Sequence, residues 1–199
     1  MNEAEARQEF IDFMHEVEAE PMHVVQVAKL AVLLFDQLRE LHSLSAHDRL
    51  ILEGAACLHD IGRSITPGGL DHHKASAKLI RKRRWKCWDE ESVDVIALVA
   101  RYHRRALPER DQKDFGRLEP PDQSRVEQLA AFLRIADGLD RTHRSYVCDL
   151  AAKIDAVKIS IHLKMREFAD REVAAAKAKS DLAQRVFRRE FLFTAELAP

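Results

Sequence analysis

The sequence predicts a mainly α-helical domain over residues 1–145 and a small ββαβ appendage over residues 146–199. Three observations lead to this fold class. Apolar residues recur at helical spacing through most of the first part, whereas short alternating stretches begin only after Ser145. Only 6 glycines and 6 prolines occur in the 199 residues, which argues against a disordered or hairpin-rich chain.

The N-terminal third of the chain predicts two long helical segments and a third helix. The first stretch extends from Glu3 to His42 and is interrupted at Pro21. A capping-box pattern at Ser45–Asp48 begins the next helix. We expect that helix to end at Gly62, because glycine is favoured just past a helix C-terminus.

The middle of the chain predicts three more helices separated by loops. A loop at Thr66–Gly69 precedes a short helix over about residues 74–82, and Asp89 can cap the following helix. Residues 106–121 are polar and contain proline, so we expect a long loop there. A second capping-box pattern, Ser124–Glu127, predicts the start of the last helix of this part.

The appendage is predicted because the spacing of apolar residues changes from helical to alternating after Ser145. Two alternating stretches, 146–154 and 157–163, are separated by Asp155-Ala156, which is typical of a β-hairpin. An alanine- and charge-rich helix should follow over residues 170–188, and Phe191–Phe193 should return as an edge strand. An exposed edge is a surface that a second copy of the chain can cover, so we expect a homodimer.

Composition excludes several classes of protein. The chain has 32 Lys and Arg against 33 Asp and Glu, which gives a net charge of -1. The segment Arg81–Trp88 is basic and aromatic, as in proteins that bind single-stranded nucleic acid. Because the net charge of the chain is close to zero, we nevertheless expect no nucleic-acid partner. Three cysteines without CxxC spacing fit reduced thiols, and no apolar run approaches a bilayer span. We therefore expect a cytoplasmic protein with no membrane partner.

Five ionisable residues interrupt the apolar stripes of four predicted helices: His23, His59, Asp60, His103 and Asp137. A lone buried carboxylate costs several kcal/mol, so gathering these groups at one place is explained by a cation among them. Imidazole nitrogen and carboxylate oxygen are the ligands that manganese, iron, zinc and nickel accept. Each histidine taken alone is more commonly a hydrogen-bonded core residue, and this remains the alternative.

The same residues carry a family resemblance. His23, His59-Asp60 within Cys57–Gly62, and Asp137 within Arg134–Arg141 resemble the H…HD…D signature of the HD superfamily of metal-dependent phosphohydrolases. Three stretches resemble, more specifically, the C-terminal HD domain of the exopolyphosphatase/guanosine pentaphosphate phosphatase (Ppx/GppA) family: His72–Ile80, Arg101–Arg104 and Arg134–His143. The likeness covers about residues 21–145 and implies an HD-domain helical bundle. Lys179–Leu182 and Arg185–Phe187 resemble the segment that follows this domain in those proteins.

The resemblance implies a metal centre with one or two divalent ions: manganese, iron, nickel, zinc or magnesium. The first ion would be held by His23, His59, Asp60 and Asp137. A second ion would use His72 or His73 together with His103, with Asp60 as a bridge. Asp60 and Arg63 are the implied catalytic residues, and the implied phosphate contacts are Arg63, Lys74, Arg104 and Arg141. Arg63 stands where many HD enzymes have lysine.

Two functions follow from this resemblance. The first is a phosphohydrolase that acts on a phosphomonoester or phosphodiester of a nucleotide or similar small molecule. The alternative is a non-catalytic module that binds polyphosphate or an alarmone nucleotide and partners a separately encoded actin-like phosphatase domain. The longer family members carry an actin-like module before the HD domain, and this chain begins shortly before His23. We therefore expect that the chain by itself is not an exopolyphosphatase.

Overall fold

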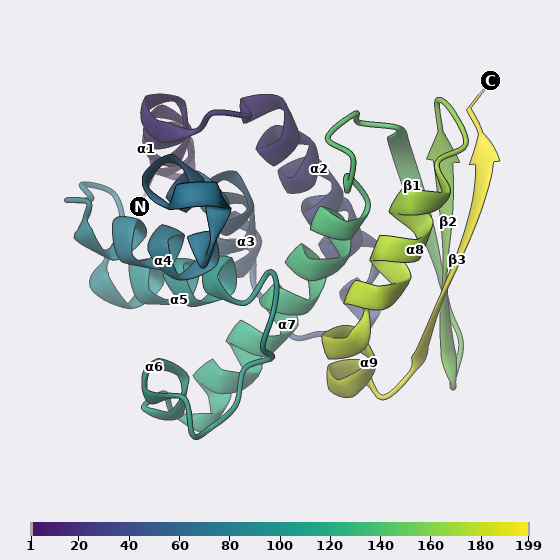
Figure 1. Ribbon diagram of the computed structural model, residues 1–199. Coiled ribbons are helices and arrows are strands. Elements are labelled where there is room, and N and C mark those ends of the chain that lie inside the picture. The colour runs from purple at the N-terminus through teal and green to yellow at the C-terminus, as the bar shows by residue number, and fades with distance from the viewer. Residues whose placement is uncertain (1, 199) are drawn as a thin grey trace.

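The structure is a computed structural model that describes residues 2–198 (Figure 1). Within these residues, nine α-helices and three strands follow one another, and the predicted mainly α fold with a small ββαβ appendage is confirmed. The helices of the first part are α1 (Glu3–Val17), α2 (Pro21–Gln37), α3 (Ala46–Leu58), α4 (His72–Lys82), α5 (Glu90–Arg101), α6 (Lys113–Gly116) and α7 (Pro120–Gly138). The appendage comprises β1 (Val147–Ile154), β2 (Lys158–Met165), α8 (Asp170–Lys179), α9 (Asp181–Phe187) and β3 (Glu190–Leu197). Three short 3-10 turns are η1 (Arg39–Leu41), η2 (Ile61–Ile65) and η3 (Pro67–Gly69).

The helical part is built around α2, α3, α5 and α7, whose apolar faces meet in one core. Each of these helices is amphipathic or apolar, so its buried stripe can only be removed from water against its neighbours. The capping box at Ser45 is confirmed. The side-chain oxygen of Ser45 accepts a hydrogen bond from the backbone N–H of Asp48, and the Asp48 carboxylate accepts one from the backbone N–H of Ser45. None of the described helices combines the length and apolarity needed to cross a bilayer.

The appendage is a three-stranded sheet with the order β1-β2-β3, antiparallel between β1 and β2 and parallel between β2 and β3. Alternate residues of β2, including Ile159, Ile161 and Leu163, are fully buried, so one face of the sheet belongs to the core. Helices α8 and α9 lie between this sheet and α7 (Figure 1). The division of the chain into two domains at residue 145 and the homodimer through the sheet edge stay predictions.

Helices α8 and α9 are fastened to α7 and to the segment that follows it at three places. A Cβ on Gly138 would lie 2.8 Å from the Cα of Ala176, so glycine lets the two helix backbones approach closely. The guanidinium of Arg134 donates two bonds to the Asp181 carboxylate, at 3.0 and 2.8 Å. The backbone N–H of Thr142 donates to buried Glu172 over 3.1 Å. The C-terminal end of α8 therefore has a defined position against α7.

Several predicted boundaries are wrong. Helix α7 begins at Pro120, not Ser124, because proline is tolerated in the first helical turn, where its missing N–H has no partner to lose. The predicted loop before it contains α6. The single helix expected over residues 170–188 is two helices that meet at Ser180.

The segment around Gly62 also differs from expectation. Helix α3 ends at Leu58, and the chain continues as a 3-10 turn that passes against α4. A Cβ on Gly62 would overlap the carbonyl oxygen of His72. Glycine is therefore required at this position because the turn packs closely against α4, and not because a helix ends there. Helix α4 begins at His72, two residues earlier than predicted.

Candidate functional site

Six predicted metal ligands come together in one place. They lie on or shortly after five helices, on parts of the chain far apart in sequence, and all but Asp137 are buried. They are His23 of α2, His59 and Asp60 after α3, His72 of α4, His103 after α5 and Asp137 of α7. The convergence inferred from the interrupted apolar stripes is therefore present in the structure.

Three of these histidines are oriented by backbone carbonyls. A carbonyl oxygen can only accept, so each ring must carry its proton on Nδ1, and Nε2 is left with a lone pair. The Nδ1 donations are His59 to Ala56 at 2.7 Å, His72 to Gly69 at 2.8 Å, and His103 to Ala100 at 2.7 Å. This is the arrangement by which metal-ligating histidines are usually held.

The inward-facing atoms lack hydrogen-bond partners. Nε2 of His23, Nε2 of His59 and Oδ1 of Asp60 are buried and unpaired. The Nε2 atoms of His72 and His103 lie 3.3 Å apart, although both are acceptors. Buried acceptors that face one another are costly unless a cation or a shared proton lies among them. The donor set therefore fits a divalent metal ion.

Three overlapping groups of residues could hold an ion, each with its candidate ligand atoms within 4.8 Å of one another. Asp60 belongs to two of them, so its carboxylate is placed to bridge two ions. The groups are His23, His59 and Asp60; His59, His103 and Asp137; and Asp60, His72 and His103. Nitrogen and oxygen ligands of this kind suit first-row transition metals.

Charge in the site is divided between neutral rings and ionised carboxylates. Burial lowers the pKa of His59 and, much further, that of His103. Burial alone would raise the pKa of Asp137, but the ammonium of Lys179 and the ring of His23 hold it well below its ordinary value. The site therefore presents negative oxygens and uncharged nitrogen lone pairs, a combination that attracts a cation.

His23 has a different environment because carboxylates flank both ring nitrogens. Its Nδ1 lies 2.8 Å from Oδ2 of Asp140, and its Nε2 lies 3.6 Å from Oδ1 of Asp137. Although burial acts in the opposite direction, these two carboxylates raise the pKa of His23 to about 9. A metal ion at Nε2 would compete with that proton.

Asp140 and His143 support His23, and the sequence analysis did not assign them a role. Asp140 is fully buried and also accepts from the backbone N–H of Ser145 over 2.7 Å. The ring of His143 stacks on that of His23, with 3.7 Å between centroids. The spacing Asp137-x-x-Asp140 is one helical turn, so it was the signal that could have indicated a second carboxylate directed at the same histidine.

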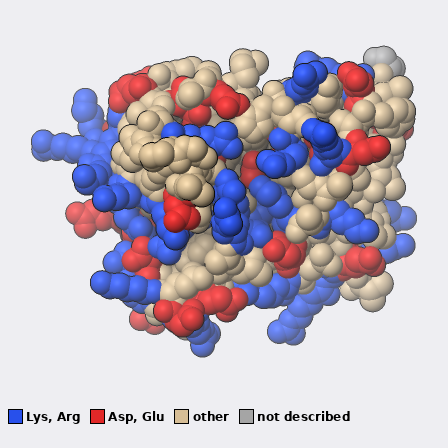
Figure 2. Space-filling view, in the orientation of Figure 1, with Lys and Arg blue, Asp and Glu red and all other residues tan. Residues whose placement is uncertain are grey.

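Four of the six candidate ligands, Asp60, His72, His103 and Asp137, line a hollow of about 310 Å³, which we call the central hollow. Three predicted phosphate contacts lie on its wall: Arg63, Arg104 and Arg141. Nε of Arg63 lies 2.9 Å from Oδ2 of Asp60, so this guanidinium forms an ion pair with a ligand carboxylate as well as facing the hollow. Lysine and arginine side chains gather in the middle of the face drawn in Figure 2, between the α4–α5 side and α8.

Two predicted residues lie outside this arrangement. None of the ion-holding groups found in residues 2–198 includes His73. Its ring centroid is 6.4 Å from that of His103. Of the two neighbouring histidines, only His72 belongs to such a group. Lys74 is exposed, contacts Asp71 at 3.2 Å and does not line the central hollow. Successive helical residues point about 100° apart, so only one of the three neighbours on α4 can face the site.

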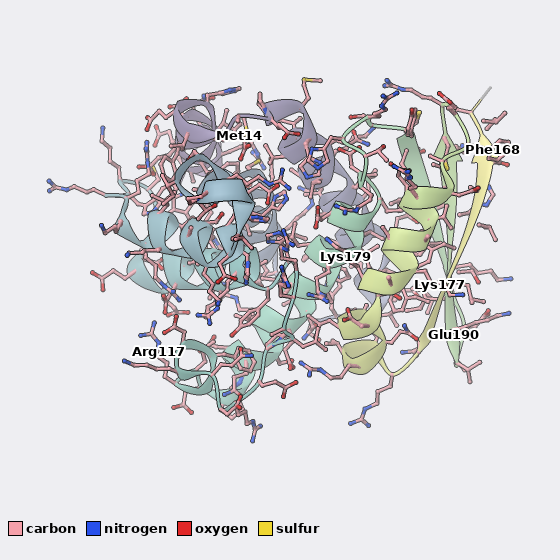
Figure 3. The ribbon with its side chains drawn as sticks, in the orientation of Figure 1. Met14, Arg117, Phe168, Lys177, Lys179 and Glu190 are labelled. Atoms are coloured by element: carbon pink, nitrogen blue, oxygen red, sulfur yellow. The ribbon has the colours of Figure 1, made fainter. Side chains whose placement is uncertain are left out.

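Two cations of the site were not predicted. Arg105 lines the central hollow directly after Arg104. Lys179, the last residue of α8, reaches from the appendage, and its Nζ contacts Oδ2 of Asp137 (Figure 3). No local sequence signal distinguishes Lys179 from the other lysines of α8, because its role depends on how α8 packs on α7.

Comparison with protein families identifies a family that matches this chain. The model of the family described as Ppx/GppA phosphatase, domain III, matches residues 8–184, which is most of the chain and includes every residue of the central hollow. The match extends through α8 and into α9, so Lys179 lies within it as well.

Proposed function

The chain belongs to the Ppx/GppA phosphatase domain III family, and from this premise we propose that it is a metal-dependent phosphohydrolase. Its substrate would be a phosphomonoester or phosphodiester of a nucleotide or similar small molecule. The observation that carries this proposal is the set of buried side-chain atoms without hydrogen-bond partners on His23, His59 and Asp60, which face the same point as the other ligands. A purely structural polar cluster would pair such atoms with one another or with backbone groups.

His23, His59, Asp60 and Asp137 would hold one divalent ion, and His72 and His103 would hold a second one together with Asp60. When bound, such ions lower the pKa of coordinated water and neutralise phosphoryl oxygens under attack. Asp60 uses its two oxygens differently: Oδ1 faces Nε2 of His72 at 3.0 Å, while Oδ2 forms an ion pair with Arg63. The contact with Arg63 fixes the carboxylate so that Oδ1 stays directed at the ligands.

The cations of the central hollow would bind the phosphate of the substrate. Arg104, Arg105 and Arg141 form no ion pair with a carboxylate anywhere in residues 2–198. Arginine is well suited to this task because its planar guanidinium donates two parallel bonds to phosphate oxygens. Lys179 would add a point charge on the side of Asp137 that faces away from His23.

The direct test is to purify the protein without chelator, determine its metal content, and assay a panel of phosphorylated substrates. We expect bound transition metal, hydrolysis that is lost on chelation, and recovery with manganese, because both charge neutralisation and water activation require the ion. The panel should include nucleotides, cyclic dinucleotides, alarmones and long-chain polyphosphate. Protein free of metal after such a purification, with activity unaffected by chelator, would contradict the proposal.

The same panel examines the alternative function, a module that binds polyphosphate or an alarmone without hydrolysing it. The unpaired arginines of the central hollow favour an anionic ligand under either function. We expect long-chain polyphosphate to be a poor substrate of this chain. Metal-loaded protein that binds alarmones or polyphosphate but hydrolyses no member of the panel would favour the binding module, partnered by a separate actin-like phosphatase domain.

Replacing Arg63 with alanine should mainly weaken substrate binding. A phosphate contact that exists both before and during the reaction stabilises both states, so its loss raises KM more than it lowers kcat. A charge-assisted hydrogen bond contributes about 1.5–3 kcal/mol, which corresponds to a rise in KM of about ten- to a hundredfold. Initial rates over a range of substrate concentrations measure both constants. Arg39→Ala, at an exposed arginine of η1, is the matched control, and a fall confined to kcat would exclude the binding role.

A further inference from the structure

The central hollow adjoins two further hollows that share no residue with each other. The first, of about 410 Å³, shares Arg63, His72, Arg104 and Arg105 with it and is bounded by the loop around η3; we call it the loop hollow. The second, of about 850 Å³, shares Arg141 and Ala175 with it and is bounded by the start of α8; we call it the appendage hollow. The candidate metal site is therefore flanked by two separate spaces.

The appendage hollow has the chemistry of a site for a flat ring. Phe168, which precedes α8, is 62 % exposed, and Tyr146 lies on the same wall (Figure 3 marks Phe168). Arg144 and Arg171 also line this hollow, and neither pairs with a carboxylate in the described chain. Exposed aromatic faces and unpaired guanidinium planes are what nucleobases stack on. The volume lies within the range of small-molecule sites.

The loop hollow has a smaller volume and an apolar side chain on its wall. Leu70 is 71 % exposed on its wall, and both Gly68 and Gly69 have left-handed backbones with φ of 62° and 68°. Arg105 is also left-handed, with φ of 62°, which a residue with a side chain adopts at a cost. That conformation keeps the guanidinium at the junction between the loop hollow and the central hollow.

We propose that this site accepts a phosphodiester that joins two nucleosides. The inference rests on the proposed phosphohydrolase function and names its substrate class. A phosphomonoester carries one organic group and could fill only one of the two flanking hollows, whereas a diester has one group on each side of its phosphorus. One base would lie in the appendage hollow against Phe168 and Tyr146, and the second nucleoside in the loop hollow beside Leu70.

The reaction needs no reactant besides water. The water oxygen forms a bond to phosphorus, one ester P–O bond breaks, and the water proton passes to the oxygen of the departing nucleoside. The products are a nucleoside monophosphate and a nucleoside with a free hydroxyl group. Each product occupies only one flanking hollow.

The test measures binding by the metal-free protein, so that it does not depend on hydrolysis. Equilibrium dialysis in the presence of EDTA gives the Kd of the dinucleotide adenylyl-adenosine and that of AMP for each variant. For the dinucleotide, Phe168→Ala should raise Kd about tenfold, the usual effect of losing one stacked base. Leu70→Ala should raise it about fivefold, because part of an apolar side chain is no longer covered. AMP should respond to one of the two substitutions, not to both.

Both side chains are exposed, so neither substitution removes a core contact, and circular dichroism checks the fold. Val157→Ala is the matched control, since Val157 is 74 % exposed and lies in the turn between β1 and β2, outside all three hollows. Equal responses of AMP and the dinucleotide to both variants would overturn the two-sided site. The Kd of a single-stranded octanucleotide distinguishes the two possible sources of such a ligand. If the protein binds the octanucleotide more tightly than the dinucleotide, the site is assigned to the ends of nucleic acids instead of to free dinucleotides.

Activity then separates the two proposals. If the metal-loaded protein hydrolyses monoesters but no diester, the dinucleotide inference fails and the phosphohydrolase proposal stands. If it hydrolyses neither, yet dinucleotide binding requires both Phe168 and Leu70, the ligand class stands and the hydrolase proposal fails. Hydrolysis of the dinucleotide with a KM that rises in both variants would support both.

Discussion

Replacing Asp60 with alanine is expected to release the metal and to lower kcat/KM for any hydrolysed substrate by about a thousandfold or more. Asp60 is the carboxylate that belongs to two of the possible ion-holding groups, and its Oδ1 is one of the unpartnered acceptors. Its removal therefore takes away a ligand and a negative charge from a buried place. Elemental analysis of the purified variant measures metal content, and initial rates measure activity.

Two controls make this experiment specific. Asp36→Ala removes an exposed carboxylate that pairs with Arg49 on the surface, and we expect no loss of metal or activity. Asp60→Asn preserves the shape of the side chain but removes its charge, so it should lose most of the metal with little change in fold. If Asp60→Ala retained full metal stoichiometry, the assignment of the metal site would be wrong.

Replacing Lys179 with methionine is expected to lower kcat/KM about a hundredfold while the metal is retained. The ammonium of Lys179 contacts Oδ2 of Asp137, whereas Oδ1 of Asp137 faces Nε2 of His23 at 3.6 Å. The ligand oxygen is therefore left in place when the lysine is removed. What is lost is a positive charge at the wall of the central hollow, where a transferring phosphoryl group carries negative charge.

Lys177 provides the matched control, because it lies on the same helix two residues earlier and is exposed. Residues two apart on a helix point in nearly opposite directions, and Figure 3 labels both lysines. Lys177→Met should leave kcat/KM unchanged, and Lys179→Arg should restore part of the activity. Loss of metal from Lys179→Met, in proportion to its loss of activity, would show that the lysine acts only by holding Asp137 in place.

The elements that the sequence predicted best are those with a strong local signal. The Ser45–Asp48 capping box and the hairpin around Asp155 are both present, because side chain–backbone bonds and period-two alternation act over a few residues. Ser124 was a misleading signal, since the same capping pattern also occurs within a helix that two prolines can begin earlier. The break of the last helix at Ser180 had no comparable local mark.

The sequence by itself determined which residues form the candidate metal site. Each ligand of the first ion could be recognised because it replaces an apolar residue in the buried stripe of its own helix: His23, His59, Asp60 and Asp137. Residues three or four apart on a helix lie on the same face, so the apolar residues around each ligand indicate that its side chain faces the core. The structure brings them together at one place.

Only the tertiary structure decided the surroundings of that site. Which of His72, His73 and Lys74 faces the ligands depends on where α4 begins, since one residue rotates a side chain by about 100°. The contact of Lys179 with Asp137 depends on the close approach of α7 and α8 at Gly138. Such contacts join residues far apart in the chain, and their geometry is set by packing between helices, which no local pattern encodes.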